Sequence, residues 1–218
     1  MPLLRLDTSR LRLRTWSRED LDAILQMDLD PEVHRFSEVR VGHFEPERSV
    51  LRKAIRHQIL SGQSRSFWIV EWRSQPGFLG LIGFSHGQLG RNALSFRLVR
   101  SAWGQGIATE AARAVLDYGF RALHLPLIAA FAHKENRRSH RVLSKIGMKP
   151  DGIAALQQRS ILNITKAIRP TGSSFLDVDS SRGAMYLSYG LYRENYVSNE
   201  ETHLARAGDN RQVATNYV

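Results

Sequence analysis

The fold is decided by one stretch of this chain, Trp103-Gly104-Gln105-Gly106-Ile107-Ala108-Thr109-Glu110-Ala111. It follows a strand-like run that ends near Val99, and it opens an amphipathic pattern that continues to about Leu123. A glycine-rich turn at the start of a helix directs several backbone N–H groups and the positive end of the helix dipole at one point. The stretch therefore predicts a site for a phosphate or a diphosphate.

The segments around this turn alternate between strand-like and helix-like patterns. Two aromatic and β-branched runs flank a Pro76-Gly77 turn and predict an antiparallel hairpin before the glycine turn. No acidic residue ends a strand about 20 residues after the turn, which also argues against a doubly wound dinucleotide fold. The strands are expected at residues 11–14, 67–72, 78–84, 94–98, 127–132 and 184–191, and the helices from about residue 21 and at 46–60, 107–123 and 136–146.

Length and composition fit one globular domain. The chain has 218 residues, of which 42% are hydrophobic, and this is enough to bury a core. Residues 1–193 are expected to form the domain, with an insertion at about 153–182 that is longer than an ordinary connection between elements. Residues 194–218 carry few apolar positions and are expected to form a polar tail.

Several classes of protein are disfavoured by what the sequence lacks. No apolar run approaches the roughly 18 residues that a membrane span needs, and the start is too short for a secretory signal, so no membrane partner and a cytoplasmic location are expected. Cysteine is absent, which removes thiolate catalysis and cysteine-based zinc sites. The eight histidines show no metal-ligand spacing within one helical segment, and no metal is expected.

The net charge of +10 raises the question of nucleic-acid binding, because clustered cations gain affinity by releasing phosphate counterions. Arginine supplies nearly all of the excess, and the cations are scattered, with local density only at residues 5–18 and 134–145. A dedicated nucleic-acid surface is therefore not favoured. A ribosome- or RNA-associated module is kept as an alternative, whose affinity would fall steeply with salt.

Five blocks of the sequence recur in one known family in the same order and at similar spacing. They are residues 8–14, 30–33, 103–111, 136–139 and 145–148. In the third block, the signature Arg/Gln-x-x-Gly-x-Gly/Ala falls on Trp103, Gly106 and Ala108. The chain resembles the GNAT superfamily of acetyl-CoA-dependent N-acetyltransferases. The tryptophan is similar to the form found in the branch of ribosomal-protein N-terminal (alanine/serine) acetyltransferases.

This resemblance implies an α+β fold of three layers, in which helices flank a mixed, mostly antiparallel sheet that is splayed at its centre. The splay would lie between the strand ending at Leu98-Val99 and the strand at 127–132, and it would take the pantetheine arm of the cosubstrate, acetyl-CoA. A helix cap at Asn136 and a solvated basic face at Arg141 are the alternatives to cofactor contacts there. The cofactor-binding residues implied are Leu98, Val99, Trp103, Gly104, Gln105, Gly106, Ile107, Ala108, Thr109, Asn136 and Arg141.

The reaction implied is direct attack of a neutral amine on the thioester carbonyl, with an oxyanion held by backbone N–H groups near Val99. The glutamate of many members is missing from residues 93–96, and Leu143 stands where many carry a tyrosine acid. Ser139 matches the serine to which the N-terminal acetyltransferase branch assigns the acid role. The candidates for the base are Glu71, His86 and His133, or a water molecule held by one of them.

Weak base machinery favours an α-amino acceptor. At neutral pH, an α-amino group with a pKa near 8 costs roughly 1 kcal/mol to deprotonate, and a lysine amine with a pKa near 10.4 costs over about 4 kcal/mol. Polyamines and aminoglycosides are polycations, so an enzyme that binds them needs a cleft rich in carboxylates. This basic chain offers such a cleft only if folding gathers the acidic residues between Asp28 and Glu38.

The resemblance places acceptor specificity at residues 30–36 and in the helix at 46–60. The expected partner is an amine acceptor, either a protein N-terminus or a small molecule. A homodimer and an acetyl-CoA-binding protein without turnover are left open.

Overall fold

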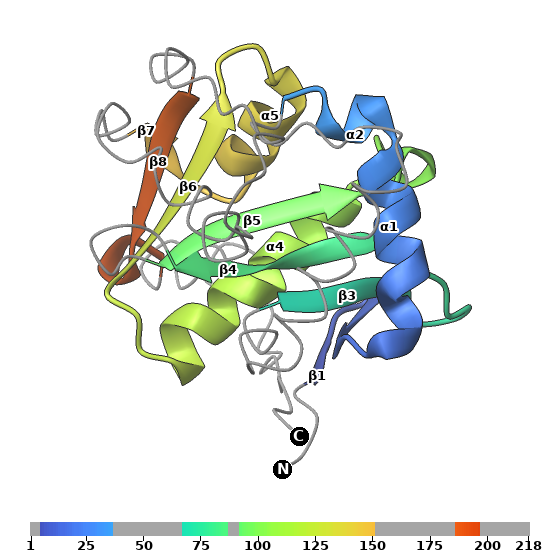
Figure 1. The fold of residues 1–218 in the computed structure, drawn as a ribbon. Helices are drawn as coiled ribbons and strands as arrows, with labels where there is room; N and C mark the ends of the chain where they lie inside the picture. Colours follow the sequence, from blue (N-terminus) through green and yellow to red (C-terminus); the bar gives the residue numbers. More distant parts are fainter. Residues whose placement is uncertain (1–4, 37–66, 87–91, 151–185, 197–218) are drawn as a thin grey trace, which may run out of the picture.

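The computed structural model describes residues 5–36, 67–86, 92–150 and 186–196, and its central feature is a mixed sheet (Figure 1). Within these residues, the sheet has eight strands in the order β1-β2-β3-β4-β5-β6-β8-β7, and all neighbours are antiparallel except β5 and β6. This confirms the mixed, mostly antiparallel sheet. The strands are β1 (Arg5–Asp7), β2 (Leu11–Thr15), β3 (Phe67–Trp72), β4 (Gly80–His86), β5 (Asn92–Leu98), β6 (Leu127–His133), β7 (Lys149–Pro150) and β8 (Tyr186–Tyr192).

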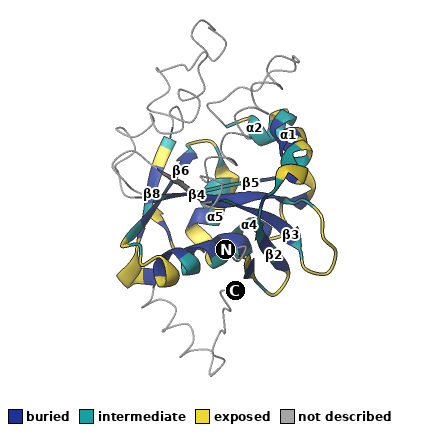
Figure 2. Cartoon of the chain, turned by 60° about the horizontal axis from the view of Figure 1, so that its bottom comes forward, coloured by how far each residue is buried: buried dark blue, intermediate teal, exposed yellow. Residues whose placement is uncertain are grey.

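Helices cover both faces of the sheet, and the central strands are buried between them (Figure 2). Side chains alternate along a strand, so β3 serves two cores: Trp68 and Val70 pack in the larger core with α4, whereas Ile69 packs with Ile24 and Met27 of α1. The described helices are α1 (Leu21–Leu29), α2 (Pro31–His34), α4 (Ile107–Asp117) and α5 (Arg137–Lys145).

The helix after the glycine turn packs closely on the sheet, as its small residues predicted. Small residues on its inner face, Ala111, Ala112 and Val115, are fully buried. At Gly119, a Cβ would stand 2.8 Å from atoms of Phe84 and of Ile128, so glycine permits this close approach. The prediction of one continuous helix to residue 123 needs correction, because α4 ends at Asp117 and a π-helical turn follows over Tyr118–Ala122.

The sheet divides where β5 and β6 stop pairing. The two strands pair over three residues each, up to Leu94 opposite Ala130, yet β5 continues to Leu98 and β6 to His133. Figure 1 shows the strands diverging toward these ends. The splay implied by the resemblance therefore lies between β5 and β6, and it separates a β1–β5 arm from a β6–β8 arm.

Parts of the sequence-based scheme lie outside the described residues, namely the helix expected at 46–60, the insertion at 153–182 and the tail beyond residue 196. The first residues of that tail are packed, because Tyr196 is buried and its ring centroid lies 5.0 Å from that of Phe120. None of the described helices is long and apolar enough to cross a membrane. In the same residues, no group of three or more histidines and carboxylates is arranged to hold a metal ion.

Candidate active site

The glycine-rich loop leads from β5 into α4. After a 3-10 turn at Arg100–Ala102, Gly104 and Gly106 both adopt a φ of +78°, in the left-handed region. Gly106 immediately precedes the helix, and no described side chain caps this helix end. The first N–H groups of α4 have no partner within the helix and are directed at the loop. This arrangement can bind an anion such as a diphosphate.

The loop leaves space beside its backbone. A Cβ on Gly104 would meet no atom within 4 Å, and a Cβ on Gly106 would meet the Arg10 guanidinium at 3.5 Å. Glycine is therefore required here by backbone conformation and not by crowding. Open space next to unbonded N–H groups is what a phosphate chain needs, so these residues fit the diphosphate of acetyl-CoA.

Glu110, in the first turn of α4, ties the loop to the N-terminal strands. Its carboxylate accepts hydrogen bonds from Thr8 Oγ1 at 2.6 Å, from Arg10 N at 3.0 Å and from Arg10 Nε at 2.7 Å. Burial raises the pKa of Glu110, but the hydrogen bonds from Thr8 and Arg10 outweigh burial and hold the pKa below its ordinary value. Direct contacts therefore join two of the sequence blocks that resemble the GNAT superfamily, residues 8–14 and 103–111.

Trp103 braces the loop against β5. Its indole Nε1–H donates to the Leu98 carbonyl at 2.9 Å, and the Arg138 guanidinium of α5 lies over its ring, 4.5 Å from the centroid. Arg10 donates to the Gln105 carbonyl at 3.2 Å. The sequence singled out Trp103 but not Arg138, because only the fold brings the start of α5 beside the loop. Arg138 adds a positive charge beside the glycine loop.

The free edge of β5 presents a defined set of backbone groups to the splay. The Val99 N–H donates to the Leu79 carbonyl at 3.0 Å, so it points toward β4 and is already bonded. Successive residues of an antiparallel strand present their N–H and C=O groups to opposite edges, so those of Phe96 and Leu98 point toward β6. Pairing with β6 ends at Leu94. The N–H groups near Val99 that face the splay are therefore those of Leu98 and Phe96.

The candidates at the start of α5 lie close to the loop. Asn136 is the N-cap of α5, and its Oδ1 accepts the Ser139 N–H at 3.1 Å. This contact is the helix-cap alternative for Asn136, and it leaves the side-chain NH₂ group without a partner among the described residues. Ser139 is half-buried in the first turn, whereas Arg141 is exposed and lies further along the helix.

The three residues that the sequence offered as the catalytic base lie on three different strands. Glu71 is buried on β3 and forms ion pairs with Arg14 at 3.0 Å and with Arg12 at 3.6 Å. These two ion pairs occupy the carboxylate, so the contacts favour a structural role. His86 is the last residue of β4, and its side chain lies outside the described part of the structure. His133 ends β6, where its Nδ1 accepts a backbone N–H at 3.2 Å.

The corner after α1 spans the open end of the splay. Phe36, just beyond α2, accepts a hydrogen bond at its carbonyl from Tyr186 Oη of β8, at 2.7 Å. Its ring centroid lies 5.2 Å from that of His133 on β6. Because α1 packs on the β1–β5 arm, this corner connects the two arms of the sheet.

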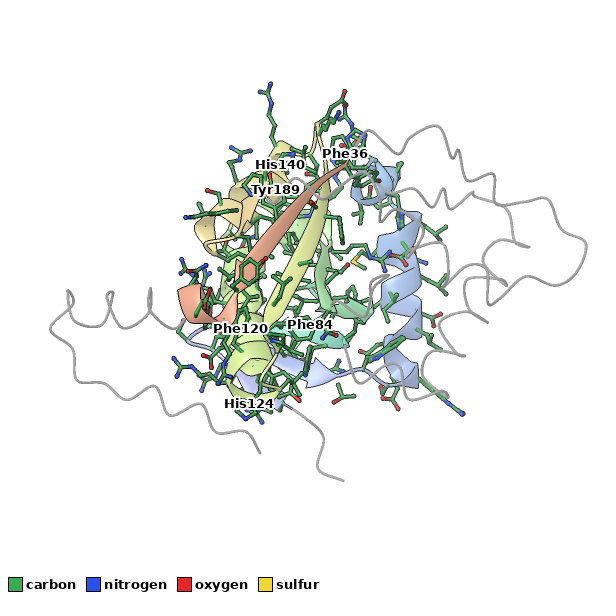
Figure 3. All side chains as sticks on the ribbon, turned by 90° about the vertical axis from the view of Figure 1, so that its left-hand side faces the viewer. Phe36, Phe84, Phe120, His124, His140 and Tyr189 are labelled. Atoms are coloured by element: carbon green, nitrogen blue, oxygen red, sulfur yellow. The ribbon has the colours of Figure 1, made fainter. Side chains whose placement is uncertain are left out.

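A second polar contact fixes α5 to β8. His140 Nδ1 lies 2.7 Å from Tyr189 Oη, and His140 Nε2 lies 3.1 Å from the Lys134 carbonyl (Figure 3). A carbonyl oxygen only accepts, so Nε2 carries the proton and Nδ1 accepts from the phenol. Burial raises the pKa of Tyr189, which keeps this phenol protonated at neutral pH. Both nitrogens of His140 are engaged, and the pair holds the β6–β8 arm together.

Known proteins share this sequence pattern. The family model described as "Acetyltransferase (GNAT) domain" matches residues 10–149. An uncharacterized N-acetyltransferase, p20, from Bacillus licheniformis is 31% identical over 148 residues, which are 67% of this chain and 83% of the relative. The spermidine N(1)-acetyltransferase of Escherichia coli K12 is 30% identical over 146 residues, which are 65% of this chain and 74% of the relative.

Solved structures share the fold. Mycobacterium smegmatis RimJ in complex with CoA-disulfide aligns with a TM-score of 0.59 at 22% identity, covering 95% of this chain and 93% of that chain. The ribosomal-protein-S5-alanine acetyltransferase from Vibrio fischeri aligns with a TM-score of 0.60 at 13% identity, covering 88% of this chain and 98% of that chain. At these identities the likeness shows the fold alone.

A splayed mixed sheet with a glycine loop at its central helix defines a protein of the N-acetyltransferase class. The chain belongs to the GNAT acetyltransferase family, and it is an acetyl-CoA-dependent N-acetyltransferase. The family, the fold and the enzyme class that the sequence implied are therefore confirmed. Membership does not name the amine that is acetylated.

Proposed function

We propose that this enzyme acetylates the α-amino group of a protein N-terminus by direct attack of the neutral amine on the thioester of acetyl-CoA. The observation that carries the proposal is the uncapped glycine loop at α4 beside the unpaired edge of β5. Residues 104–109 would hold the diphosphate, and backbone groups of Phe96 and Leu98 would hold the pantetheine arm. The bound cosubstrate supplies the activated acetyl group.

The start of α5 would complete the cosubstrate site. The Asn136 NH₂ group would donate to the pantetheine arm while its Oδ1 keeps the helix cap, and Arg141 would lie along the same molecule. Ser139 would stand near the sulfur as the acid. A thiol leaving group with an ordinary pKa near 8.5 needs little protonation, so a weak acid such as serine is sufficient.

The charge pattern of the described residues supports a singly charged acceptor over a polycation. The described buried carboxylates, Asp20, Asp28 and Glu71, each lie beside an arginine. Asp30 is occupied as the N-cap of α2, where its Oδ1 accepts the Glu32 N–H at 2.9 Å. A polyamine needs several carboxylates that are free to pair with it, whereas a single ammonium needs only one carboxylate that can exchange its arginine.

The test is a thiol-release screen with acetyl-CoA and three classes of amine. They are peptides with free N-terminal alanine or serine, lysine peptides with a blocked N-terminus, and spermidine, which is included because a relative at 30% identity is named for it. Turnover that is greatest with the free N-terminal peptides is expected. Turnover confined to lysine side chains or to spermidine would overturn the proposed acceptor.

A further inference from the structure

A buried polar cluster lies between α1, α2 and β5. Asp28 Oδ1 lies 3.3 Å from His34 Nε2 and 3.0 Å from Arg97 Nη1. The Asp28 and His34 side chains are 3% and 9% exposed, whereas that of Arg97 is 40% exposed. Neither contact has hydrogen-bond geometry. Asp28 Oδ1 and both ring nitrogens of His34 are shielded from solvent and have no hydrogen-bond partner among the described residues.

The unbonded atoms of this cluster define what would satisfy them. A buried polar atom without a partner costs about 1–3 kcal/mol, so such atoms call for an explanation. The Asp28–His34 contact lacks hydrogen-bond geometry, so it does not place a proton on Nε2, and a neutral imidazole with its proton on Nδ1 presents Nε2 as an acceptor 3.3 Å from Asp28 Oδ1. Asp28 Oδ1 and His34 Nε2 are then two neighbouring acceptors, which one cationic donor satisfies together. A primary ammonium is such a group.

The cluster lies on the side from which an acceptor can reach the splay. Arg97 belongs to the part of β5 that no longer pairs with β6, and its contact with Asp28 places its side chain on the α1 face. The opposite face is filled by the larger core under α4 and α5. Just beyond His34, Phe36 contacts β6 and β8. Figure 3 shows Phe36 at the upper end of the molecule. Asp28 and His34 therefore lie in the corner that joins the two arms.

We propose that Asp28 and His34 bind the acceptor ammonium and remove its proton. The ammonium exchanges with the exposed Arg97 guanidinium at Asp28, and His34 Nε2 takes one proton. The neutral nitrogen forms a bond to the acetyl carbonyl carbon, the C–S bond breaks, and the second proton leaves the nitrogen and ends on the thiol sulfur. His34 then releases its proton to solvent. This inference rests on the amine chemistry of the proposed function and names a base for it.

The other described histidines are less suited to this role. His133 accepts a backbone N–H at Nδ1, both nitrogens of His140 are engaged, and His124 is exposed at the end of the molecule opposite Phe36 (Figure 3). Among the described residues, the charged groups near His34 are Asp28 on α1 and Arg97 on β5, together with Asp30, Glu32 and Arg35 at or on α2.

The experiment compares His34→Gln and Asp28→Asn with the exposed control His124→Gln in the full chain. Rates are measured from pH 5.5 to 9 with an alanine-terminated peptide, a blocked lysine peptide and spermidine. His34→Gln is expected to lower kcat/KM for the amine about 100-fold and to remove the part of the pH profile that an imidazole base contributes. Asp28→Asn is expected to raise the amine KM about tenfold, with the KM for acetyl-CoA unchanged in both.

A second measurement needs no turnover. Ring ¹⁵N signals of His34 are followed by NMR while ethylammonium chloride is added to the coenzyme A complex, and a shift is expected that Asp28→Asn abolishes. An unchanged pH profile in His34→Gln, or an equal loss in His124→Gln, overturns the inference while the acceptor proposal stands. If spermidine is the only amine that is acetylated and its turnover depends on His34, the proposed N-terminal acceptor is wrong and the inference about His34 stands. Absence of turnover together with an unmoved His34 signal overturns the inference.

Discussion

Single residues in the glycine loop are fixed by backbone conformation. Gly104 has a φ of +78° and open space where a Cβ would stand. Gly104→Ala is expected to reduce the free energy of unfolding by about 1–2 kcal/mol, because the left-handed region disfavours a side chain. Coenzyme A should also bind at least tenfold more weakly by calorimetry, since the loop N–H groups would turn away from the diphosphate.

The matched control for this substitution is Gly147→Ala. Gly147 has a φ of +82° and equally open surroundings, but it follows α5 at the end remote from the loop. A similar loss of stability with unchanged coenzyme A affinity is expected. Equal losses of affinity in the two variants would show that the loop has no special part in binding.

Glu110 gives a prediction about pH. Its pKa is held below the ordinary value of 4.5, so the ionised carboxylate contributes stability that is present above pH 4.5 and is lost as pH falls through the folded-state pKa. Glu110→Gln is expected to lower the free energy of unfolding by about 1–3 kcal/mol at pH 7. In urea titrations, the difference in free energy of unfolding between Glu110→Gln and the wild type should become smaller as the pH falls below 4.5. Glu135→Gln, at an exposed position, is the control and should unfold with the same free energy as the wild type. A difference for Glu110→Gln that stays constant down to pH 3 would contradict the stabilising role of the ionised Glu110 carboxylate.

At the scale of secondary-structure elements, the packing of α4 decides where the loop lies. Gly119→Ala would place a Cβ 2.8 Å from atoms of Phe84 and Ile128. Either these two side chains or the π-helical turn that carries Gly119 would have to shift, and a loss of about 1–3 kcal/mol in the free energy of unfolding is expected from thermal and urea denaturation. Gly77→Ala, which meets nothing within 4 Å, is the control and should change stability little. An unaltered Gly119→Ala would mean that the helix and sheet are not in close contact there.

Local patterns predicted these elements because their causes are local. The hairpin strands and the loop depend on alternation and on glycine turns, which a short window of sequence contains. The contacts of Glu110 with Thr8 join positions 102 residues apart, and the Asp28–Arg97 contact joins two different elements. No periodicity encodes such pairs. The π-helical turn at Tyr118–Ala122 was also missed, since an apolar stripe does not distinguish a π-turn from a continuing α-helix.

At the scale of the whole molecule, the sheet consists of two arms that separate beyond Leu94 and Ala130. β5 and β6 share three residue pairs, and beyond these the arms are connected on one side by the α1–α2 corner. The glycine loop, where we propose that the cosubstrate binds, belongs to the β1–β5 arm, and the start of α5 follows the β6–β8 arm. A change in the corner should therefore affect the acceptor more than the cosubstrate.

Tyr186→Phe tests this separation, because it removes the hydrogen bond from Tyr186 Oη to the Phe36 carbonyl and leaves the ring in place. Loss of one hydrogen bond of about 0.5–1.5 kcal/mol is expected to raise the KM for an alanine-terminated peptide about two- to tenfold. The KM for acetyl-CoA should stay the same, because the loop and the β5 edge are untouched. Tyr192→Phe on the same strand, where the side chain is 49% exposed, should change neither KM. A parallel rise of both KM values in Tyr186→Phe would mean that the corner sets the spacing of the arms for both substrates.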